Sequence, residues 1–254
     1  MKIKVMSYNV LCYGPDEMNW TLRKGMVTDI IKREAPDSFG VQEAHFDWMT
    51  ALSNALPEYS YIGAGRDDGK NDGEFSAVFY LKDKFDVLDS GTFWLSETPD
   101  TPSRGWDGRC SRVCSWAKLQ DKESKKVYVH MNNHLDHIGP VARQNGLQLL
   151  LDFAAKFSEP VVLTGDFNFN EGCELYRQMT SGTLKDAKFA AKDSKGGITY
   201  NAFYPIKNKA EDMAIIDFIN VSNDVDVISY NVIDDKPDGK FPSDHYPVAA
   251  EIEI

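Results

Sequence analysis

The sequence predicts a mixed α/β domain in which helices cover the faces of β-sheets. Runs of β type outnumber amphipathic helices, and each helix is followed by a turn and an apolar strand, as in Arg33–Val41 and Lys156–Leu163. Turn-forming residues are spread throughout, and no repeat, low-complexity segment or long linker divides the 254 residues. We therefore expect a single domain over residues 1–254.

Nine segments are predicted to be strands because their apolar residues alternate or run continuously. In chain order they are Ile3–Val10, Ser38–Val41, Ser76–Leu81, Phe85–Leu95, Val113–Leu119, Val127–Leu135, Val161–Thr164, Ile215–Val221 and Tyr246–Ile252. Two amphipathic helices are predicted from apolar stripes at helical spacing, one formed by Leu22, Met26, Val27, Ile30 and Ile31 and the other by Leu147, Leu150, Leu151, Ala154 and Phe157. A third helical pattern spans Phe46–Leu56.

The charge balance bears on the class of partner. Lys and Arg number 28 against 39 Asp and Glu, a formal net charge of −11 at pH 7. This balance disfavours sequence-independent binding to nucleic acid, which depends on cationic side chains displacing counterions, but it is compatible with a local basic cleft.

No stretch approaches the roughly 20 apolar residues of a membrane span. The start lacks the apolar core of a secretory signal, so we expect a cytoplasmic protein unless a signal preceded Met1.

The four cysteines, Cys12, Cys110, Cys114 and Cys173, show no CxxC pairing. If Cys110 and Cys114 lie on one strand, about 13 Å separates them, which is too far for a disulfide. We expect all four to be ordinary thiols.

Polar side chains gather where the predicted strands end. The strand Val161–Thr164 runs into Asp166 and Asn168, which share a face if strand geometry continues. His134 likewise ends a strand, on the same face as His130 and Asn132. Such a face is either solvated or lines a cleft.

Four further polar interruptions fall at strand ends or within strands: Ser7-Tyr-Asn9, Gln42-Glu43, Asp217 and Ser243-Asp244-His245. Any one of them fits a solvated strand end, but six together indicate a common site. Oxygen ligands without thiolates suit Mg²⁺ or Mn²⁺ better than structural Zn²⁺. Such a cation, with His and Asn donors beside it, provides what phosphoryl chemistry needs.

The chain resembles the endonuclease/exonuclease/phosphatase superfamily of Mg²⁺-dependent phosphoesterases. The matching motifs lie in the family's order over essentially the whole chain: Ser7-Tyr-Asn9, Gln42-Glu43, Asn132-Asn-His134-Leu-Asp-His137, Gly165-Asp-Phe-Asn168, Ile216-Asp-Phe-Ile219 and Ser243-Asp-His245. Other segments, such as Gly65-Arg-Asp-Asp-Gly69 and Gly73-Glu-Phe-Ser76, are similar to an uncharacterised bacterial branch that is distantly related to deadenylase-type nucleases. Asn133 departs from the pattern, in which Thr is usual.

The resemblance implies a four-layer α/β/β/α sandwich of two mixed sheets, the DNase I-like fold, with its active site at one end of the sheets. It implies that Glu43 is the principal Mg²⁺ ligand, with Asn9 beside it and Asp244 contributing to the same or a second metal position. Mn²⁺ is expected to substitute for Mg²⁺. Asp166 would orient or deprotonate the attacking water, and Asn168 would steady water and phosphate.

The resemblance also assigns the histidines. His245 would contact phosphate oxygens and be held by Asp217, whereas His134 would donate to another phosphate oxygen. Glu74 matches a position that in some relatives pairs with this second histidine. Asp136 and His137, which are typical of the bacterial branch, are included among the candidate substrate-binding residues.

Two arginines are candidates to neutralise a substrate phosphate, because a guanidinium group makes bidentate contacts. They are Arg104 and Arg112, which precede the strand Val113–Leu119. With the histidines and one or two Mg²⁺ ions, we expect them to form a small positive pocket on a negative surface. Tyr200, Phe203 and Trp106 are candidates for stacking on a base.

The expected function is hydrolysis of a phosphodiester by metal-assisted in-line attack of water. Short RNA, single-stranded nucleic acid and small phosphodiesters are the candidate substrates, and we expect a monomer. A phosphomonoesterase or a phosphoinositide-type phosphatase is the alternative enzyme, because a shared fold does not choose among substrates. A binding protein that has lost the chemistry is disfavoured, since the complete set of site residues is present.

Overall fold

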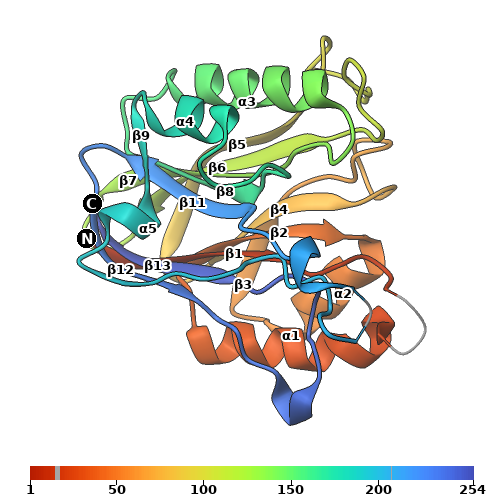
Figure 1. Cartoon of the computed structure of the whole chain (residues 1–254). Coiled ribbons are helices and arrows are strands. Elements are labelled where there is room, and N and C mark those ends of the chain that lie inside the picture. The colour runs from red at the N-terminus through yellow and green to blue at the C-terminus, as the bar shows by residue number, and fades with distance from the viewer. Residues whose placement is uncertain (15–17, 207) are drawn as a thin grey trace.

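Two mixed β-sheets form the centre of the molecule, shown in Figure 1 as a computed structural model that describes residues 1–14, 18–206 and 208–254. In spatial order, the first sheet contains β10 (Asp193–Lys195), β12 (Asp226–Val232), β13 (Val248–Glu253), β1 (Lys2–Asn9), β2 (Ser38–Ala44), β4 (Phe75–Leu81) and β3 (Tyr59–Ile62). The second contains β5 (Phe85–Trp94), β6 (Val113–Asp121), β7 (Val127–His134), β8 (Val161–Asp166), β11 (Asp217–Ser222) and β9 (Leu184–Asp186).

Helices cover the outer faces of both sheets (Figure 1). The helices α1 (Trp20–Glu34) and α2 (Phe46–Ala55) lie on the first sheet, and α3 (Pro140–Ala154) and α4 (Glu174–Thr180) lie on the second. The short helix α5 (Ala187–Ala190) and the 3₁₀ turns η2 (Ala210–Asp212) and η3 (Pro237–Gly239) complete the described elements. The predicted four-layer sandwich is therefore confirmed.

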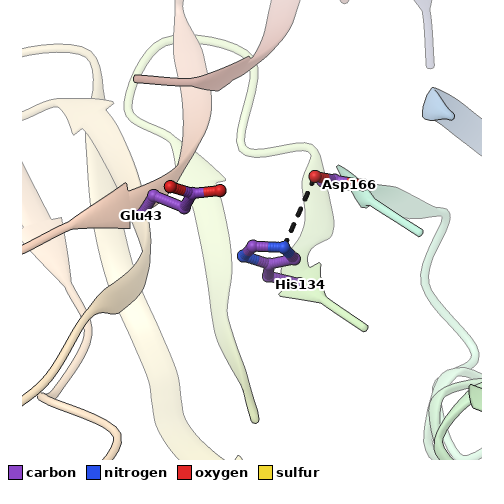
Figure 2. Close-up of side chains that lie close together, drawn as sticks. All are labelled: Glu43, His134 and Asp166. Carbon is purple, nitrogen blue, oxygen red and sulfur yellow. Dashed lines mark ion pairs between the residues drawn. The ribbon is translucent and has the colours of Figure 1, made fainter. Parts of the chain in front are cut away.

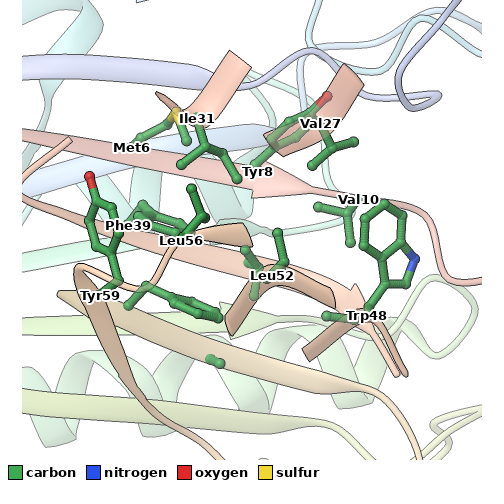
Figure 3. Close-up of a cluster of buried hydrophobic side chains, with 14 of the residues drawn as sticks. Met6, Tyr8, Val10, Val27, Ile31, Phe39, Trp48, Leu52, Leu56 and Tyr59 are labelled. Carbon is green, nitrogen blue, oxygen red and sulfur yellow. The ribbon is translucent and has the colours of Figure 1, made fainter. Parts of the chain in front are cut away.

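Three buried apolar clusters hold these layers together. Figure 3 shows the outer cluster of the first sheet, where Ile31 and Leu52 from the helices pack on Met6 and Phe39 from the strands. A second cluster fills the space between the sheets, and a third joins α3 and α4 to the second sheet. Both outer faces and the inter-sheet face are therefore apolar over most of their area, which explains why the central strands have nearly continuous apolar sequences.

The helix α1 corrects one detail of the predicted apolar stripe. Leu22 is 64% exposed, whereas the neighbouring Arg23 is buried. The Arg23 guanidinium donates to the carbonyl oxygens of Val10, Leu11 and Pro242. Burial of this cation is possible because backbone oxygens satisfy it, and it ties α1 to the chain that leaves β1.

The predicted strands and the three predicted helices are present, with bounds that differ by a few residues. The elements that were not predicted are β3, β9, β10, β12, α4 and α5, most of which are short or carry little apolar periodicity.

All four cysteines are free thiols, as predicted. No helix in the described parts of the chain is both long and apolar enough to cross a membrane.

Two pairs of parallel strands determine where the site forms. The strand β1 is parallel to β2 in one sheet, and β7 is parallel to β8 in the other. Parallel strands end at the same edge of a sheet. Asn9, Glu43, His134 and Asp166, which lie at these strand ends, are consequently brought to one edge of the sandwich.

A buried polar layer joins the two sheets beneath this edge. The Gln42 amide nitrogen donates to Asn132 Oδ1 at 2.6 Å, and the Asn132 amide nitrogen donates to the Val41 and Ala77 carbonyl oxygens. Thr164 Oγ1 also donates to Asn132 Oδ1, at 3.0 Å. These bonds pair most polar atoms of the fully buried side chains, and Gln42 Oε1 is left without a partner among the described residues. The layer therefore fixes how the sheets are placed relative to one another.

The polar layer requires Gly40, because a Cβ atom there would lie 2.1 Å from Asn132 Oδ1 and 2.6 Å from Thr164 Oγ1. Gly40→Ala should therefore lower the free energy of unfolding by about 2 kcal/mol or more, measured by denaturant titration. The same substitution at Gly25, an exposed position of α1 with no atom within 4 Å of the added Cβ, should raise stability by about 0.5–1 kcal/mol. Equal effects of the two substitutions would contradict this account.

Candidate functional site

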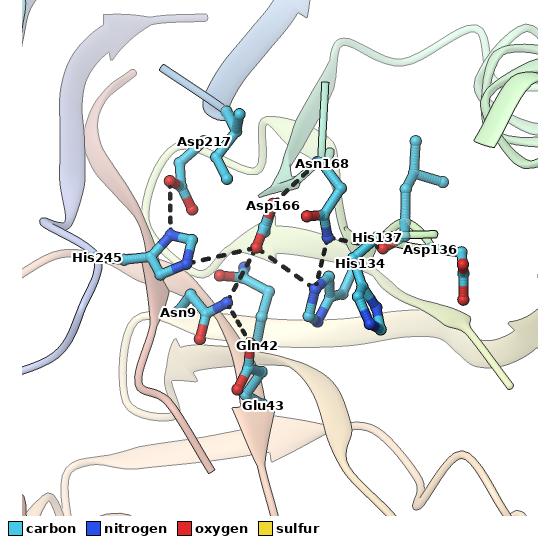
Figure 4. A network of polar contacts seen from close by, with 12 residues as sticks. Asn9, Gln42, Glu43, His134, Asp136, His137, Asp166, Asn168, Asp217 and His245 are labelled. Atoms are coloured by element: carbon cyan, nitrogen blue, oxygen red, sulfur yellow. Dashed lines mark hydrogen bonds and ion pairs between the residues drawn. The ribbon is translucent and has the colours of Figure 1, made fainter. Parts of the chain in front are cut away.

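Polar side chains from both sheets converge on a cavity of about 370 Å³ at the edge where the parallel strands end (Figure 4). Its lining includes four carboxylates (Glu43, Glu74, Asp166 and Asp244), two guanidinium groups (Arg66 and Arg112), three imidazoles (His134, His137 and His245), and Asn168, Tyr200, Cys110 and Ile216. The structure thus brings most of the predicted site residues into one cavity.

Asn9 connects the two sheets at the base of the site. Its Nδ2 atom donates to Glu43 Oε1 and to Asp166 Oδ2, both at 3.0 Å, and its Oδ1 atom accepts from the Leu11 amide. The side chain is fully buried. Because its nitrogen faces both carboxylates, Asn9 positions them in this geometry, whereas the sequence analysis placed it among the metal ligands.

Glu43 reaches the cavity through an irregularity in β2. Strict alternation would place Gln42 and Glu43 on opposite faces of the strand. The pairing of β2 with β4 shifts register between Val41 and Ala44, and Glu43 has a left-handed φ of 59°. Its Oε2 atom also accepts from the Cys12 amide at 3.2 Å. The bulge therefore allows the side chains of both residues to reach the space between the sheets.

The acidic side chains differ in how readily they hold a proton. Burial and the nearby charge of Asp217 raise the pKa of Asp166 to about 7. Burial raises the pKa of Asp244 to about 6, and the charge of Glu43 adds to the shift. Burial acts on Glu43 too, but the Asn9 hydrogen bond and the charge of His245 hold its pKa below the usual value. Glu43 is thus the most readily ionised of the three.

His245 is held in its charged form by Asp217, as predicted from the sequence. Its Nδ1 atom donates to Asp217 Oδ2 at 2.9 Å, and its Nε2 atom lies 3.7 Å from Asp166 Oδ2. Burial opposes the charge, but the Asp217 carboxylate raises the pKa of His245 well above its usual value. The imidazolium therefore presents an N–H group and a positive charge beside Asp166.

His134 is neutral, and both of its ring nitrogens contact donor groups. Burial, together with the Arg112 charge, lowers the pKa of His134 well below its usual value. The Arg112 guanidinium can only donate, and it contacts His134 Nδ1 at 2.9 Å. His134 Nε2 lies 3.0 Å from the Asn168 amide nitrogen, which also donates to the Leu135 carbonyl oxygen, and 3.4 Å from Asp166 Oδ2. The ring is therefore held in place from both sides at the wall of the cavity.

The predicted pair of Glu74 with His134 is wrong. Glu74 instead forms an ion pair with Arg66 and lies 3.8 Å from Arg112. The histidine nitrogen that the pair would have used is taken by Arg112. Two guanidinium groups attract this carboxylate more strongly than a neutral imidazole can.

The two arginines predicted to face the substrate differ in position. Arg112 lines the cavity, but its terminal nitrogens contact His134 and His137, so it mainly orients these rings. Arg104 is exposed and is not among the residues that line the cavity. Arg66 lines the cavity, although the sequence predicts no substrate role for it beyond its place in the motif Gly65-Arg-Asp-Asp-Gly69. An arginine between the glycines of a short loop is the feature of the sequence that could have identified it.

Asp136 does not line the cavity, which corrects its assignment to the substrate-binding set. Its two oxygens accept four backbone amides, from Arg109, Cys110, Ile138 and Gly139. Although burial opposes it, these bonds lower the pKa of Asp136 to about 2. The residue therefore organises the loops around the cavity.

Of the aromatic residues predicted to stack on a base, Tyr200 lines the cavity, whereas Phe203 is only 5% exposed and packs on Phe241.

Two groups of side chains in the described structure could hold a metal ion. Glu43, His134 and Asp166 form one (Figure 2), and Asp166, Asp217 and His245 form the other; in each, one potential ligand atom per residue lies within 4.8 Å of the others. His245 is charged, and His134 Nε2 is already in contact with the Asn168 amide nitrogen, which leaves carboxylate oxygens as the ligands. Four cavity carboxylates against two guanidinium groups also favour a bound cation. Both features fit Mg²⁺ or Mn²⁺.

Comparison with known proteins identifies the family. Residues 6–245 match the model of the endonuclease/exonuclease/phosphatase family. The chain belongs to this family. It is 35% identical to a mannosyl-6-phosphatase from Bacteroides thetaiotaomicron, whose structure superposes with a TM-score of 0.92 over 99% of this chain and 100% of that one. The predicted resemblance to a bacterial branch is thereby confirmed.

More distant relatives include a nuclease. The chain is 24% identical to the CCR4-Not complex 3'-5'-exoribonuclease subunit Ccr4 of Candida albicans, over 98% of this chain and 41% of the relative. It is 26% identical to an uncharacterized protein of Acanthamoeba polyphaga mimivirus, over 67% of this chain and 65% of the relative. The chain thus spans less than two thirds of both relatives.

Cation binding should depend on pH because Asp166 and Asp244 have raised pKa values. Between their unfolded values near 4 and about 6–7, the folded state holds more protons than the unfolded state, so metal-free stability falls as pH rises through this window. Mg²⁺ competes with these protons. We therefore expect saturating Mg²⁺ to raise Tm by about 5 °C or more at pH 8 and by much less at pH 5, measured by thermal unfolding.

Glu43→Gln should remove most of this Mg²⁺-dependent rise in Tm. Glu123→Gln is the matched control, because Glu123 is exposed in the turn that precedes β7, at the opposite end of that strand from His134. If Mg²⁺ raised Tm equally in the wild type and in the Glu43 variant, Glu43 would not be a cation ligand. An equal shift at both pH values would contradict the proton competition.

Proposed function

We propose that this protein is a Mg²⁺- or Mn²⁺-dependent hydrolase of small phosphate esters and that a phosphomonoester such as a sugar phosphate is its substrate. The observation that carries the proposal is the cavity itself, in which carboxylates able to hold a cation face Arg66, Arg112 and a charged His245. A phosphate group is complementary to this combination of a cation and N–H donors. The 35% identity to a mannosyl-6-phosphatase supports the monoester.

The cation would be held by Glu43, with Asp244 contributing, and would supply Lewis-acid stabilisation of the phosphate charge. Asp166 lies beside this position, with a pKa of about 7 that suits a group accepting a proton near neutral pH. Water would attack phosphorus and pass a proton to Asp166. The bond between phosphorus and the ester oxygen would break, and the departing oxygen would take a proton from solvent to give the free alcohol. His245 and His134 would donate to phosphate oxygens.

A short phosphodiester is the second candidate substrate. The similarity to the Ccr4 exoribonuclease extends over 98% of this chain, and it favours this candidate. The net charge of −11 disfavours a long nucleic acid, which would need an extended basic track. Cytoplasmic location and a monomeric state are part of the proposal.

Asp166→Asn should lower kcat by roughly 10²–10⁴, the usual effect of losing a general base, while the protein stays folded. Asn keeps one oxygen that accepts from the Asn168 amide, a bond that Asp166 makes at 2.9 Å. Phosphate release and Tm should be measured together, with Asp224→Asn at an exposed turn as the control. A kcat near the wild-type value would show that a group other than Asp166 acts as the general base.

The substrate class is tested by a panel assayed with Mg²⁺ and with Mn²⁺. It should contain mannose 6-phosphate, p-nitrophenyl phosphate, bis-p-nitrophenyl phosphate, oligo-A RNA, plasmid DNA and a phosphoinositide. We expect kcat/KM for monoesters to exceed that for diesters at least tenfold, and KM to change only about twofold between 50 and 200 mM salt, since one phosphate is engaged. Preferred RNA cleavage with a steep salt dependence would contradict the monoester.

A further inference from the structure

A second cavity, of about 380 Å³, adjoins the catalytic one. Arg66 and Glu74 line both, so the ion pair between them forms a shared wall. The second cavity lies between the start of α2 and the loop that connects β3 to β4. A substrate whose phosphate occupied the first cavity could extend into the second past this pair.

The second cavity differs from the first in charge and in apolar content. Besides Glu74, three carboxylates, from Asp47, Asp67 and Asp72, line it, and Arg66 is the one guanidinium group among the described residues that line it. Tyr13 and Phe46 line it too, with 62% and 45% of their surface exposed. Exposed rings beside a catalytic cavity are available to pack on a ligand.

His45 supports the aromatic side of the same cavity. It is only 7% exposed and stacks on Tyr13 at a centroid distance of 4.6 Å. Its Nδ1 atom accepts from the Trp48 amide at 3.3 Å as the cap of α2. Its Nε2 atom is buried and has no hydrogen-bond partner among the described residues. His45 therefore contributes to the cavity by holding the Tyr13 ring in place.

The loop that carries the acidic residues is held rigidly. Asp67 N and Arg66 N donate to the carbonyl oxygens of Asp72 and Glu74 across the loop. Gly73, with φ of 82°, would place a Cβ only 2.5 Å from an Asp67 carboxylate oxygen. The carboxylates are therefore set in place by the backbone, as a specificity site requires.

We infer that this second cavity binds the alcohol part of the substrate and that this part is an uncharged, polyhydroxylated group such as a sugar ring. Carboxylates accept hydrogen bonds from hydroxyl groups, and the rings of Tyr13 and Phe46 pack on the C–H face of a sugar. A second phosphate or a nucleotide backbone would be repelled by the three carboxylates. The inference rests on the proposed function, since it assumes that a phosphate group occupies the first cavity.

Calorimetry on the Asp166→Asn protein with Mg²⁺ separates the two cavities, because this variant binds without rapid turnover. Inorganic phosphate probes the first cavity, mannose 6-phosphate probes both, and a hexose bisphosphate adds a second charge. We expect mannose 6-phosphate to bind about tenfold more tightly than phosphate. Adding Asp67→Asn and Asp72→Asn should lower this advantage to about twofold and leave phosphate affinity unchanged, since charged acceptors make the stronger hydrogen bonds.

The bisphosphate should respond in the opposite direction, binding several-fold more tightly once the two carboxylates are neutralised. Asp224→Asn, the same change at an exposed turn, should alter none of these affinities. If phosphate binds but mannose 6-phosphate has no advantage, or the bisphosphate is preferred by the unaltered cavity, the inference is overturned while the proposed function stands. If phosphate itself does not bind with Mg²⁺, the proposed function fails as well.

Discussion

The amide group of Asn9 spans the two sheets, and the site depends on it. One nitrogen donates to Glu43 from the first sheet and to Asp166 from the second. This contact is possible only because the sheets approach closely beneath it, where Asn132 occupies the space beside Gly40. The geometry of the site therefore depends on how the sheets pack. A change in the distance between the sheets would move Glu43, the proposed cation ligand, away from Asp166, the proposed proton acceptor.

The charges of the site are balanced in pairs across the cavity. Asp217 holds His245 in its charged form, and burial beside the Arg112 charge keeps His134 neutral. The two histidines therefore differ in charge. Asp166 lies within 4 Å of both. A phosphate bound among these groups would meet donors whose orientation is set before it arrives.

The sequence predicts most central strands and their ends because apolar periodicity and polar interruptions are local properties, whereas the arrangement in four layers is implied by the family resemblance. It also predicts the pair of Asp217 with His245, which the family motifs carry. It does not predict that Glu74 pairs with Arg66, or that Asp136 accepts four backbone amides, because these contacts depend on how loops fold over one another. Arg104 is predicted to face the substrate because it precedes the strand at Val113, and no such role is predicted for Arg66, since nearness in sequence says little about how loops are placed.

Anomalous diffraction from crystals grown with Mn²⁺ and inorganic phosphate tests the central claim most directly. The account predicts one Mn²⁺ bonded to the Glu43 carboxylate at about 2.2 Å, with inorganic phosphate between this ion, His245 and Arg66, and with Asp166 beside the phosphate. It would be contradicted by Mn²⁺ bound only outside this cavity, with Glu43 still held by Asn9 and the Cys12 amide and no phosphate beside His245.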